Sequence, residues 1–331
     1  MQNEALYFRI SDKSSHALIT QISLAYLLQF NRLGPLDENY LLNDRPLADY
    51  AARHWITHAI SCGINKDECA SISILAQKLL EPGTAPFYNW VRMHDLDSFC
   101  TKPSELARAG FSIPGPLYYA ALTGLEKVTQ NLLDNSADVN AQKGHYVTAL
   151  QAASACGYEA VVKLLLENEA DVNAQGGYYT TALQAASAGG YEAIVKLLLE
   201  KETDVNVLGG RYGTALQAAS AGGYEAVVKL LLENEADVNA QEGYYGTALQ
   251  AASAGGHEAI VKLLLEKETD VNVQGGHYGT ALRAASVRAT AVGRDTERNA
   301  ERNAERNAVL AGDPKWIRLL CNTILITDIP S

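Results

Sequence analysis

Small, apolar and polar residues alternate in blocks through the middle of the chain. Residues 181–188 are mostly small, Thr-Ala-Leu-Gln-Ala-Ala-Ser-Ala, and a Gly-Gly pair separates them from Tyr-Glu-Ala-Ile-Val-Lys-Leu-Leu-Leu-Glu at 191–200. In the second block apolar residues recur every three or four positions, which is the spacing of one helix face. The pattern predicts two short helices, the first capped by Thr181 and ended by Gly190, because glycine tolerates positive φ.

This two-helix sequence pattern recurs at a fixed interval of 33 residues. One copy cannot bury its apolar stripe alone, so the copies must stack and stabilise one another. A period near 33 is typical of a solenoid of helix pairs. Such a fold presents a long surface, so a binding protein is the default expectation and an enzyme needs special support. The Thr-Ala-Leu triplet that opens each copy stands at Thr148, Thr181, Thr214, Thr247 and Thr280, and a weaker copy starts at Gly115.

The text Thr-Ala-Leu-Gln-Ala-Ala, Gly-Tyr or Gly-His, Val-Val-Lys-Leu-Leu-Leu-Glu and Ala-Asp-Val-Asn resembles the ankyrin repeat. Thr-Ala-Leu-Gln stands where that family usually has Thr-Pro-Leu-His. Five full copies, residues 115–279, cover half of the chain. The resemblance implies antiparallel helix pairs, projecting β-hairpin fingers and partner binding along the concave face. The predicted fold is therefore an all-α ankyrin-repeat solenoid, preceded by a small helical domain.

Two features depart from the family pattern. Where the family usually has glycine after the second helix, in a left-handed turn, this chain has Ser136, Glu169, Glu202, Glu235 and Glu268. A non-glycine residue that stays left-handed costs on the order of 1–2 kcal/mol, so we expect looser helix ends. In addition, alternate copies share longer text, Glu-Asn-Glu-Ala-Asp-Val-Asn-Ala or Glu-Lys-Glu-Thr-Asp-Val-Asn-Val, which gives a period of 66 and indicates duplication of a two-repeat block.

The sixth copy begins and then breaks. Glu-Arg-Asn-Ala occurs three times in tandem at 297–308, and text like that of a second helix resumes around Trp316. We therefore predict repeats over 113–286, five full and a sixth begun, followed by a charged insertion over 287–309. The tandem fits a charged helix and a disordered segment about equally well. Residues 310–331 are predicted to form a capping helix and tail, with a poorly ordered tail as the alternative.

Residues 1–112 lack the repeat text and predict a helical N-terminal domain. Ser15, Pro46 and Asp67 are suitable residues for the starts of helices. Apolar periodicity predicts helices over 16–30, 47–60, 67–80 and 87–93.

Residues 15–30 and 46–58 are similar to a stretch in fungal signalling ATPases of the STAND or NLR-like class. In those proteins the stretch lies between a NACHT nucleotide-binding module and a C-terminal ankyrin array. The resemblance implies that this chain is the sensor end of such a protein or a shortened relative. The G-x-x-x-x-G-K-[ST] loop that cradles phosphate is absent from these residues, so ATP hydrolysis is not carried over.

Charge and cysteine usage narrow the expected partners. The formal net charge is −11, which disfavours nucleic acid and anionic membranes because both need a cationic surface. No apolar run reaches the roughly 18 residues of a membrane span, and the first residues lack a signal-peptide pattern. The five cysteines are scattered without Cys-x-x-Cys spacing, which indicates a reduced, soluble, cytoplasmic protein. We expect no cofactor.

His54 and His58 lie four residues apart on a predicted helix and could share a metal ion. Trp55 stands where a zinc protease has glutamate, and no third ligand is evident. The nearby Cys62 and Cys69 match no zinc motif. Packed or surface histidines are therefore the favoured interpretation.

The strongest candidates for partner binding are two adjacent residues that precede each Thr-Ala-Leu triplet. The second of the two is always tyrosine, and we expect this constant row to pack finger on finger. The first varies, and we interpret this tip row as the contact to a partner, since the scaffold does not dictate its identity and Tyr, His and Arg give strong interface contacts. The alternative is that all are merely exposed loop residues. The tip row is His145, Tyr178, Arg211, Tyr244 and His277, and the constant row is Tyr146, Tyr179, Tyr212, Tyr245 and Tyr278, of which Tyr179, Tyr212 and Tyr245 are further candidate binding residues.

These features predict a non-enzymatic scaffold that binds another protein through its fingers and first helices, as the ligand-sensing end of a fungal recognition or innate-immunity protein. The alternative is a structural or autoinhibitory module, with residues 1–112 docking on the first repeat and on a separate NACHT chain. A third hypothesis, a hydrolase in the N-terminal domain, has no catalytic motif to support it.

Overall fold

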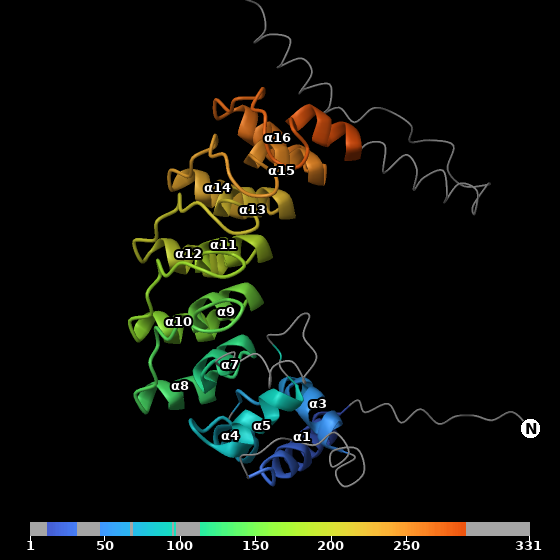
Figure 1. Cartoon of the computed structure of the whole chain (residues 1–331), viewed down its shortest axis with the longest axis vertical. Coiled ribbons are helices and arrows are strands. Elements are labelled where there is room, and N and C mark those ends of the chain that lie inside the picture. Colours follow the sequence, from blue (N-terminus) through green and yellow to red (C-terminus); the bar gives the residue numbers. More distant parts are fainter. Residues whose placement is uncertain (1–11, 32–46, 67–68, 95, 97–112, 289–331) are drawn as a thin grey trace, which may run out of the picture. The chain divides into compact units, whose positions relative to one another are not determined.

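The computed structural model describes residues 12–31, 47–66, 69–94, 96 and 113–288 of the 331-residue chain. The chain divides into two compact units, whose helices are labelled in Figure 1. The first unit consists of Met1–Ala149 with Ala160–Ala170, and the second of Leu150–Glu159 with Asp171–Ser331. The predicted insertion over 287–309 lies outside the described residues from 289 onward, as does the predicted C-terminal cap over 310–331, so both stay predictions.

The first unit begins with helices that pack around two tryptophans. The indole rings of Trp55 and Trp90 are fully buried and meet edge to face, with centroids 5.6 Å apart. The Trp90 Nε1–H donates to the carbonyl of Ala52 at 3.1 Å, which satisfies that buried polar atom. The four helices are α1 (Lys13–Leu27), α3 (Ala48–Cys62), α4 (Ala70–Leu79) and α5 (Ala85–Met93).

The predicted N-terminal helices are present, with shifted ends. Helix α1 begins at Lys13 because the Asp12 carboxylate, not a serine hydroxyl, accepts the backbone N–H of Ser15 at 2.5 Å. Asp67, the predicted cap of the third helix, lies outside the described residues, and α4 begins at Ala70.

The first repeat belongs to the same unit and contacts these helices. It consists of α7 (Pro116–Leu122) and α8 (Glu126–Asp134), and most of α10 (Glu159–Glu167) also lies in this unit. The buried ring of Tyr119 on α7 meets both Phe87 and Trp90, at centroid distances of 5.8 and 5.7 Å. Asn65 bonds to the turn between the two repeat helices, since its Nδ2 donates to Gly124 O and its Oδ1 accepts the Glu126 N–H. The degenerate first repeat thus contacts the N-terminal helices through both apolar and polar side chains.

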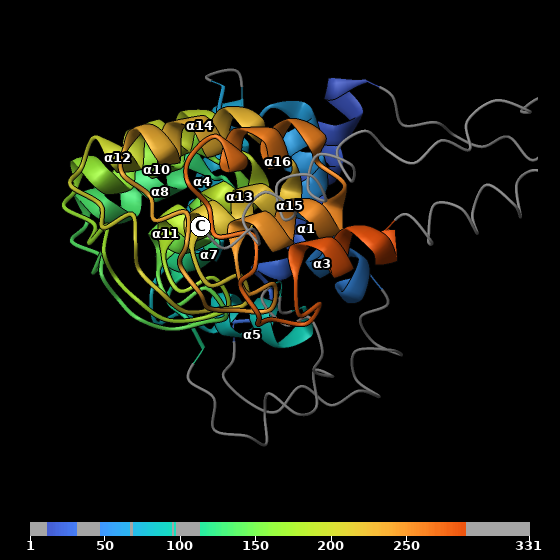
Figure 2. The same cartoon turned by 90° about the horizontal axis from the view of Figure 1, so that it is seen from above.

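The second unit is a series of helix pairs (Figure 2). First helices α11, α13 and α15 contact one another in sequence, as do second helices α12, α14 and α16. Residues 281–288 form a further helix that opens the sixth copy. The bounds are α9 (Ala149–Cys156), α11 (Ala182–Gly189), α12 (Glu192–Leu199), α13 (Ala215–Gly222), α14 (Glu225–Glu233), α15 (Ala248–Gly255) and α16 (Glu258–Leu265).

The residues predicted to begin and end the first helix of a pair do so in the copy at 181–200. The Thr181 hydroxyl accepts the Gln184 N–H at 3.1 Å and begins α11, and Gly190 ends it at φ 70°. On α12 the apolar stripe is buried, with Ile194 and Leu198 at most 1% exposed. Each such side chain contributes roughly 1.5–3 kcal/mol when removed from water, and here that water is excluded by the neighbouring pair.

The non-glycine residues after the second helices are left-handed. Glu202 has φ 55° and Glu235 φ 64°. An asparagine from the preceding repeat holds each one: Asn206 Nδ2 donates to the Glu235 carbonyl at 3.2 Å, and its Oδ1 accepts the Asp237 N–H at 2.8 Å. These bonds oppose the conformational cost, while the looser helix ends expected from the sequence stay a prediction.

The prediction of an all-α repeat solenoid is confirmed. In the described part of the chain, extended structure is confined to isolated bridges at the bases of the fingers. Across those same residues, no helix combines the length and apolarity that a membrane crossing requires.

Candidate functional site

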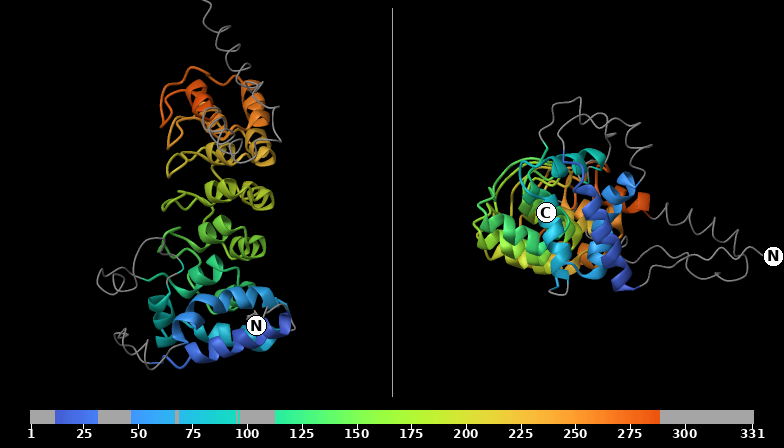
Figure 3. Two further views of the ribbon diagram at one scale, coloured as in Figure 1. Left: turned by 90° about the vertical axis from the view of Figure 1, so that its right-hand side faces the viewer. Right: turned by 90° about the horizontal axis from the view of Figure 1, so that it is seen from below.

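The loops between helix pairs of the second unit form fingers that project side by side (Figure 3). Each finger is closed by one antiparallel bridge: Gly176 to Thr180, Gly209 to Gly213, Glu242 to Gly246 and Gly275 to Gly279. In the bridges the backbone N–H of the first residue donates to the carbonyl of the second at 2.9 to 3.1 Å. The fingers are therefore short hairpins, as the resemblance to ankyrin repeats implies.

Glycine is required where adjacent fingers touch. Gly210 has φ 67°, and a β-carbon there would lie 2.7 Å from Thr180 Oγ1 and 2.9 Å from Tyr178 O on the preceding finger. Positive φ and close backbone approach both exclude a larger residue. The Gly209–Gly210 pair thus serves the packing of one finger on the next.

A buried glutamine in each of helices α9, α11, α13 and α15 fixes the base of the following finger. Gln217 Nε2 donates to Ala240 O and Gly246 O, both at 2.9 Å, and its Oε1 accepts the Thr214 N–H at 2.9 Å. Gln151, Gln184 and Gln250 make the same pair of Nε2 contacts in their repeats, at 2.8 to 3.1 Å.

The constant tyrosines of the second unit stack in the manner expected for finger-on-finger packing. Ring centroids of successive residues Tyr179, Tyr212, Tyr245 and Tyr278 are 6.0, 6.3 and 6.3 Å apart, with interplanar angles of 2 to 19°. All are half-buried. Burial is the largest cause that raises the phenol pKa of Tyr212 and Tyr245, so these rings remain neutral at physiological pH.

The tip row is held by backbone hydrogen bonds from one finger to the next. The N–H of Arg211 donates to Tyr178 O at 3.2 Å, that of Tyr244 to Arg211 O at 2.9 Å, and that of His277 to Tyr244 O at 2.8 Å. The Arg211 guanidinium carbon lies 5.7 Å from the centre of the Tyr178 ring. Tyr244 and His277 stack at 4.8 Å and 16°. The structure thus brings Tyr178, Arg211, Tyr244 and His277 into one continuous row.

The fifth tip residue lies in the other unit. His145 contacts its own neighbour Tyr146 edge to face at 5.0 Å, and the Tyr146 N–H donates to the Tyr118 hydroxyl at 3.2 Å. Arg211, Tyr244 and His277 are exposed, whereas His145 and Tyr178 are half-buried. Binding by any of these residues stays a prediction.

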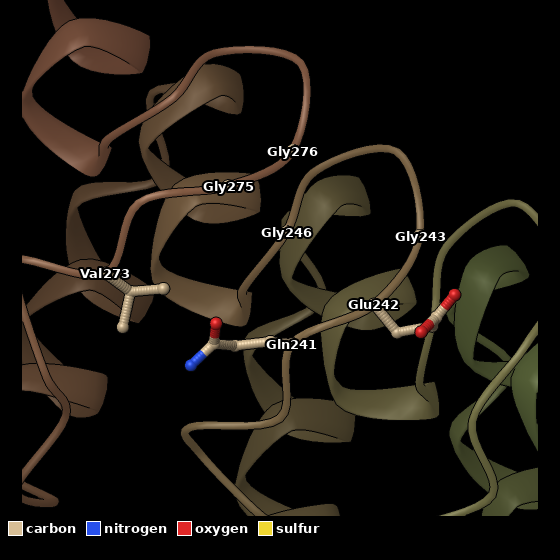
Figure 4. Close-up of a pocket in the computed structure, with 7 residues that line it drawn as sticks. All are labelled: Gln241, Glu242, Gly243, Gly246, Val273, Gly275 and Gly276. Carbon is tan, nitrogen blue, oxygen red and sulfur yellow. The ribbon is translucent and has the colours of Figure 1, made fainter.

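A groove of about 270 Å³ lies between the fingers at 240–246 and 273–279 (Figure 4). Backbone supplies most of its walls, because four of its seven lining residues are glycine. Gly243 and Gly246 bracket Tyr244 and Tyr245 in the finger at 240–246, so the groove adjoins the tip row. The other lining residues are Gln241, Glu242, Val273, Gly275 and Gly276.

His54 and His58, the pair considered as possible metal ligands, contact other side chains of the first unit. His58 Nδ1 lies 2.7 Å from His16 Nδ1 on α1, and its Nε2 lies 2.9 Å from the Tyr50 hydroxyl. His54 contacts Tyr50 through its ring, at 4.8 Å. Among the described residues no three His, Cys, Asp or Glu side chains are grouped so that they could hold a metal ion. Burial is the largest cause that lowers the pKa of His58, followed by the neighbouring imidazoles.

Two free cysteines of the first unit lie next to each other. The sulfur atoms of Cys62 and Cys69 lie 4.0 Å apart, and both residues are buried. Burial first, and then Cys69, raises the pKa of the Cys62 thiol to about 11, so it is protonated at neutral pH. This is the environment of inert core cysteines, not of a nucleophile.

The comparisons with known proteins agree with this geometry. A family model described as "Ankyrin repeats (3 copies)" matches residues 108–176 and 183–275. A curated relative, "Azaphilone pigments biosynthesis cluster protein L" of Monascus ruber, is 36% identical over 163 residues, which are 46% of this chain and 34% of that protein. The chain therefore spans about a third of the length of this relative. The helix pairs and fingers of this chain are ankyrin repeats, and its repeat array belongs to that family.

Proposed function

We propose that this chain is a non-enzymatic cytoplasmic scaffold that binds another protein through its fingers and first helices. Ankyrin repeats support a protein–protein interaction module in general. The observation that supports this particular surface is the tip row, in which Tyr178, Arg211 and Tyr244 occupy successive fingers on a shared backbone ladder. A rigid row of such residues loses little conformational entropy on binding.

The distribution of charge supports the same face. The first helices α9, α11, α13 and α15 carry no charged side chain. The second helices carry recurring ion pairs such as Glu225–Lys229, at 2.5 Å and largely exposed. Charged, solvated residues are depleted at the cores of protein interfaces, so the finger side is the better candidate for a buried contact.

A triple variant tests this proposal. Changing Tyr178, Arg211 and Tyr244 to alanine should abolish capture of the partner from extracts of native cells and leave the circular dichroism spectrum unchanged, because the constant tyrosines remain. The control is Glu225→Ala with Lys229→Ala on the opposite side of the same repeats. Retained binding by a folded triple variant would refute the assignment, as would equal loss in the control.

A more specific role follows from the resemblance of residues 15–30 and 46–58 to fungal NACHT-containing proteins. In that role the array is the recognition end of a signalling ATPase. The fungal source of the relative is consistent with it, although that relative is described as a biosynthesis cluster protein. The test is whether the captured partner changes the nucleotide turnover of a NACHT protein that co-purifies with this chain; co-purification of no such protein contradicts the role.

One observation favours the alternative of a docking role for the N-terminal helices. Leu18 and Ile22 lie one turn apart on α1 and are 57% and 55% exposed. Two large apolar side chains left in water on one helix face suit contact with another chain. A Leu18→Asp, Ile22→Asp variant should retain the partner if the fingers bind it and lose the partner if α1 does.

A further inference from the structure

Arg211 is the one cation among the fingers of the second unit. Across the fingers at 174–180, 207–213, 240–246 and 273–279 and helices α11, α13 and α15, the formal charges are Arg211 and Glu242, while Arg283 and Arg288 lie on the helix at 281–288 that follows the last finger. Arg211 makes no ion pair with any described residue, and its side chain is exposed. The lysines of helices α12, α14 and α16 are each paired with a glutamate one turn earlier, as Lys229 is with Glu225. Arg211 has no carboxylate partner of this kind among the described residues.

The position of Arg211 is fixed from both sides. Its N–H and carbonyl both belong to the backbone ladder, with Tyr178 on one side and Tyr244 on the other. The guanidinium lies over the Tyr178 ring, and this cation–π contact together with a side-chain hydrogen bond to Tyr178 orients it. A guanidinium has five N–H donors, so donors remain for a ligand, and its planar fork matches the two oxygens of a carboxylate.

Aromatic side chains flank this cation on the adjacent fingers. Tyr178 precedes Arg211 and Tyr244 follows it, and Tyr244 is 41% exposed while supported by His277. Successive fingers are 6.0 and 6.3 Å apart at the neighbouring constant tyrosines. Side chains on one face of an extended chain recur at about 6.6 Å, twice the rise of roughly 3.3 Å per residue. An extended peptide along the row therefore places every second side chain against a successive finger.

We propose that the tip row binds an extended acidic peptide segment of the partner, in which an Asp or Glu carboxylate pairs with Arg211 and apolar residues two positions to either side pack on Tyr178 and Tyr244. This inference rests on the proposed function and adds the chemistry of the partner. Arg211 is the specificity-determining residue, and the tyrosines supply apolar contact area.

A phage-displayed library of random linear 12-residue peptides provides the probe. The library is selected on the full chain, on Arg211→Glu, and on Lys229→Glu, which has the same charge change on the second-helix side. The wild-type and the Lys229→Glu proteins should enrich peptides with a central Asp or Glu and apolar residues two positions away. Arg211→Glu should bind those peptides at least about tenfold more weakly, the scale of hydrogen bonds to a charged group, and should instead enrich Lys or Arg.

The outcomes separate this inference from the proposed function. Acidic peptides that bind Arg211→Glu as well as wild type overturn the inference, and so does enrichment without an acidic residue. If the enriched peptides are not acidic but fail to bind a Tyr178→Ala, Tyr244→Ala variant, the finger face remains the binding surface. In that case only the preference for acidic peptides is refuted. Peptides that bind all variants equally overturn both.

Discussion

The buried glutamines determine how rigidly the fingers are held, and Gln217 provides the sharpest test. Its side chain is 1% exposed and makes three hydrogen bonds, two to the base of the next finger and one to the backbone N–H of Thr214. Gly246, one of the acceptors, is itself buried. Loss of the amide therefore removes one of the two donors to this buried carbonyl, which keeps only the Glu242 N–H.

The expected effect of Gln217→Ala follows from these bonds. Three neutral hydrogen bonds contribute about 0.5–1.5 kcal/mol each in net terms. Alanine regains a few tenths of a kcal/mol through its higher helix propensity. The free energy of unfolding should thus fall by about 1–4 kcal/mol. Gln217→Glu should cost at least as much at neutral pH, because it places a carboxylate against the carbonyl oxygens of Ala240 and Gly246.

Urea unfolding followed by circular dichroism measures the global loss. Hydrogen exchange at the Glu242 amide measures the loss of local stability at the base of the finger, because that N–H donates to Gly246 O at 3.1 Å. In the variant the Glu242 amide should exchange about 10- to 100-fold faster. The matched control is Gln175→Ala, an exposed finger glutamine, which should change stability by less than about 0.5 kcal/mol. A loss for Gln217→Ala no larger than that of the control would refute the role given to the buried glutamines.

Three further predictions concern stability. Glu202→Gly should raise the free energy of unfolding by about 1 kcal/mol because Glu202 is left-handed, whereas Glu200→Gly should not, since Glu200 has φ −67°; equal shifts in melting temperature would contradict this. Ser220→Ala should stabilise by up to about 1 kcal/mol, since the buried hydroxyl has no hydrogen-bond partner among the described residues, and a lower melting temperature argues against it. The pKa of His58 is held below its ordinary 6.5, so its contribution to stability is complete above that pH and is lost as the pH falls through the window below it. Urea unfolding from about pH 5 to 8 should show a flatter dependence for His58→Gln, and parallel curves would refute the assignment.

The repeat architecture could be predicted because its signals are local. A threonine cap, a glycine at positive φ and an apolar stripe lie within 20 residues of one another, and repetition removes ambiguity from each. The end of α12 at Leu199, against a predicted Glu200, shows the usual limit at helix ends. The cap at Asp12 was missed because serine and aspartate are both good caps and the sequence offered both.

Contacts across elements could not be predicted in the same way. His16 and His58 are 42 residues apart, so their contact depends on how α1 and α3 pack. The positions of the tip residues were foreseeable from their register, but the pairing of Arg211 with Tyr178 was not, since Tyr244 is equally close in sequence. The recurrence of glutamine and asparagine at fixed positions was the signal for the bonds between repeats, but the carbonyls that they contact belong to the following repeat.

Site-specific photo-crosslinking tests the central claim most directly, that the partner lies along the finger tips. A benzophenone-bearing phenylalanine analogue is placed at Tyr244 in one protein and at Lys229, on the second-helix side, in another. With the partner bound, irradiation should crosslink it efficiently from position 244 and not from position 229. A crosslink from position 229 alone, or none from position 244 while the partner remains bound, would contradict the account.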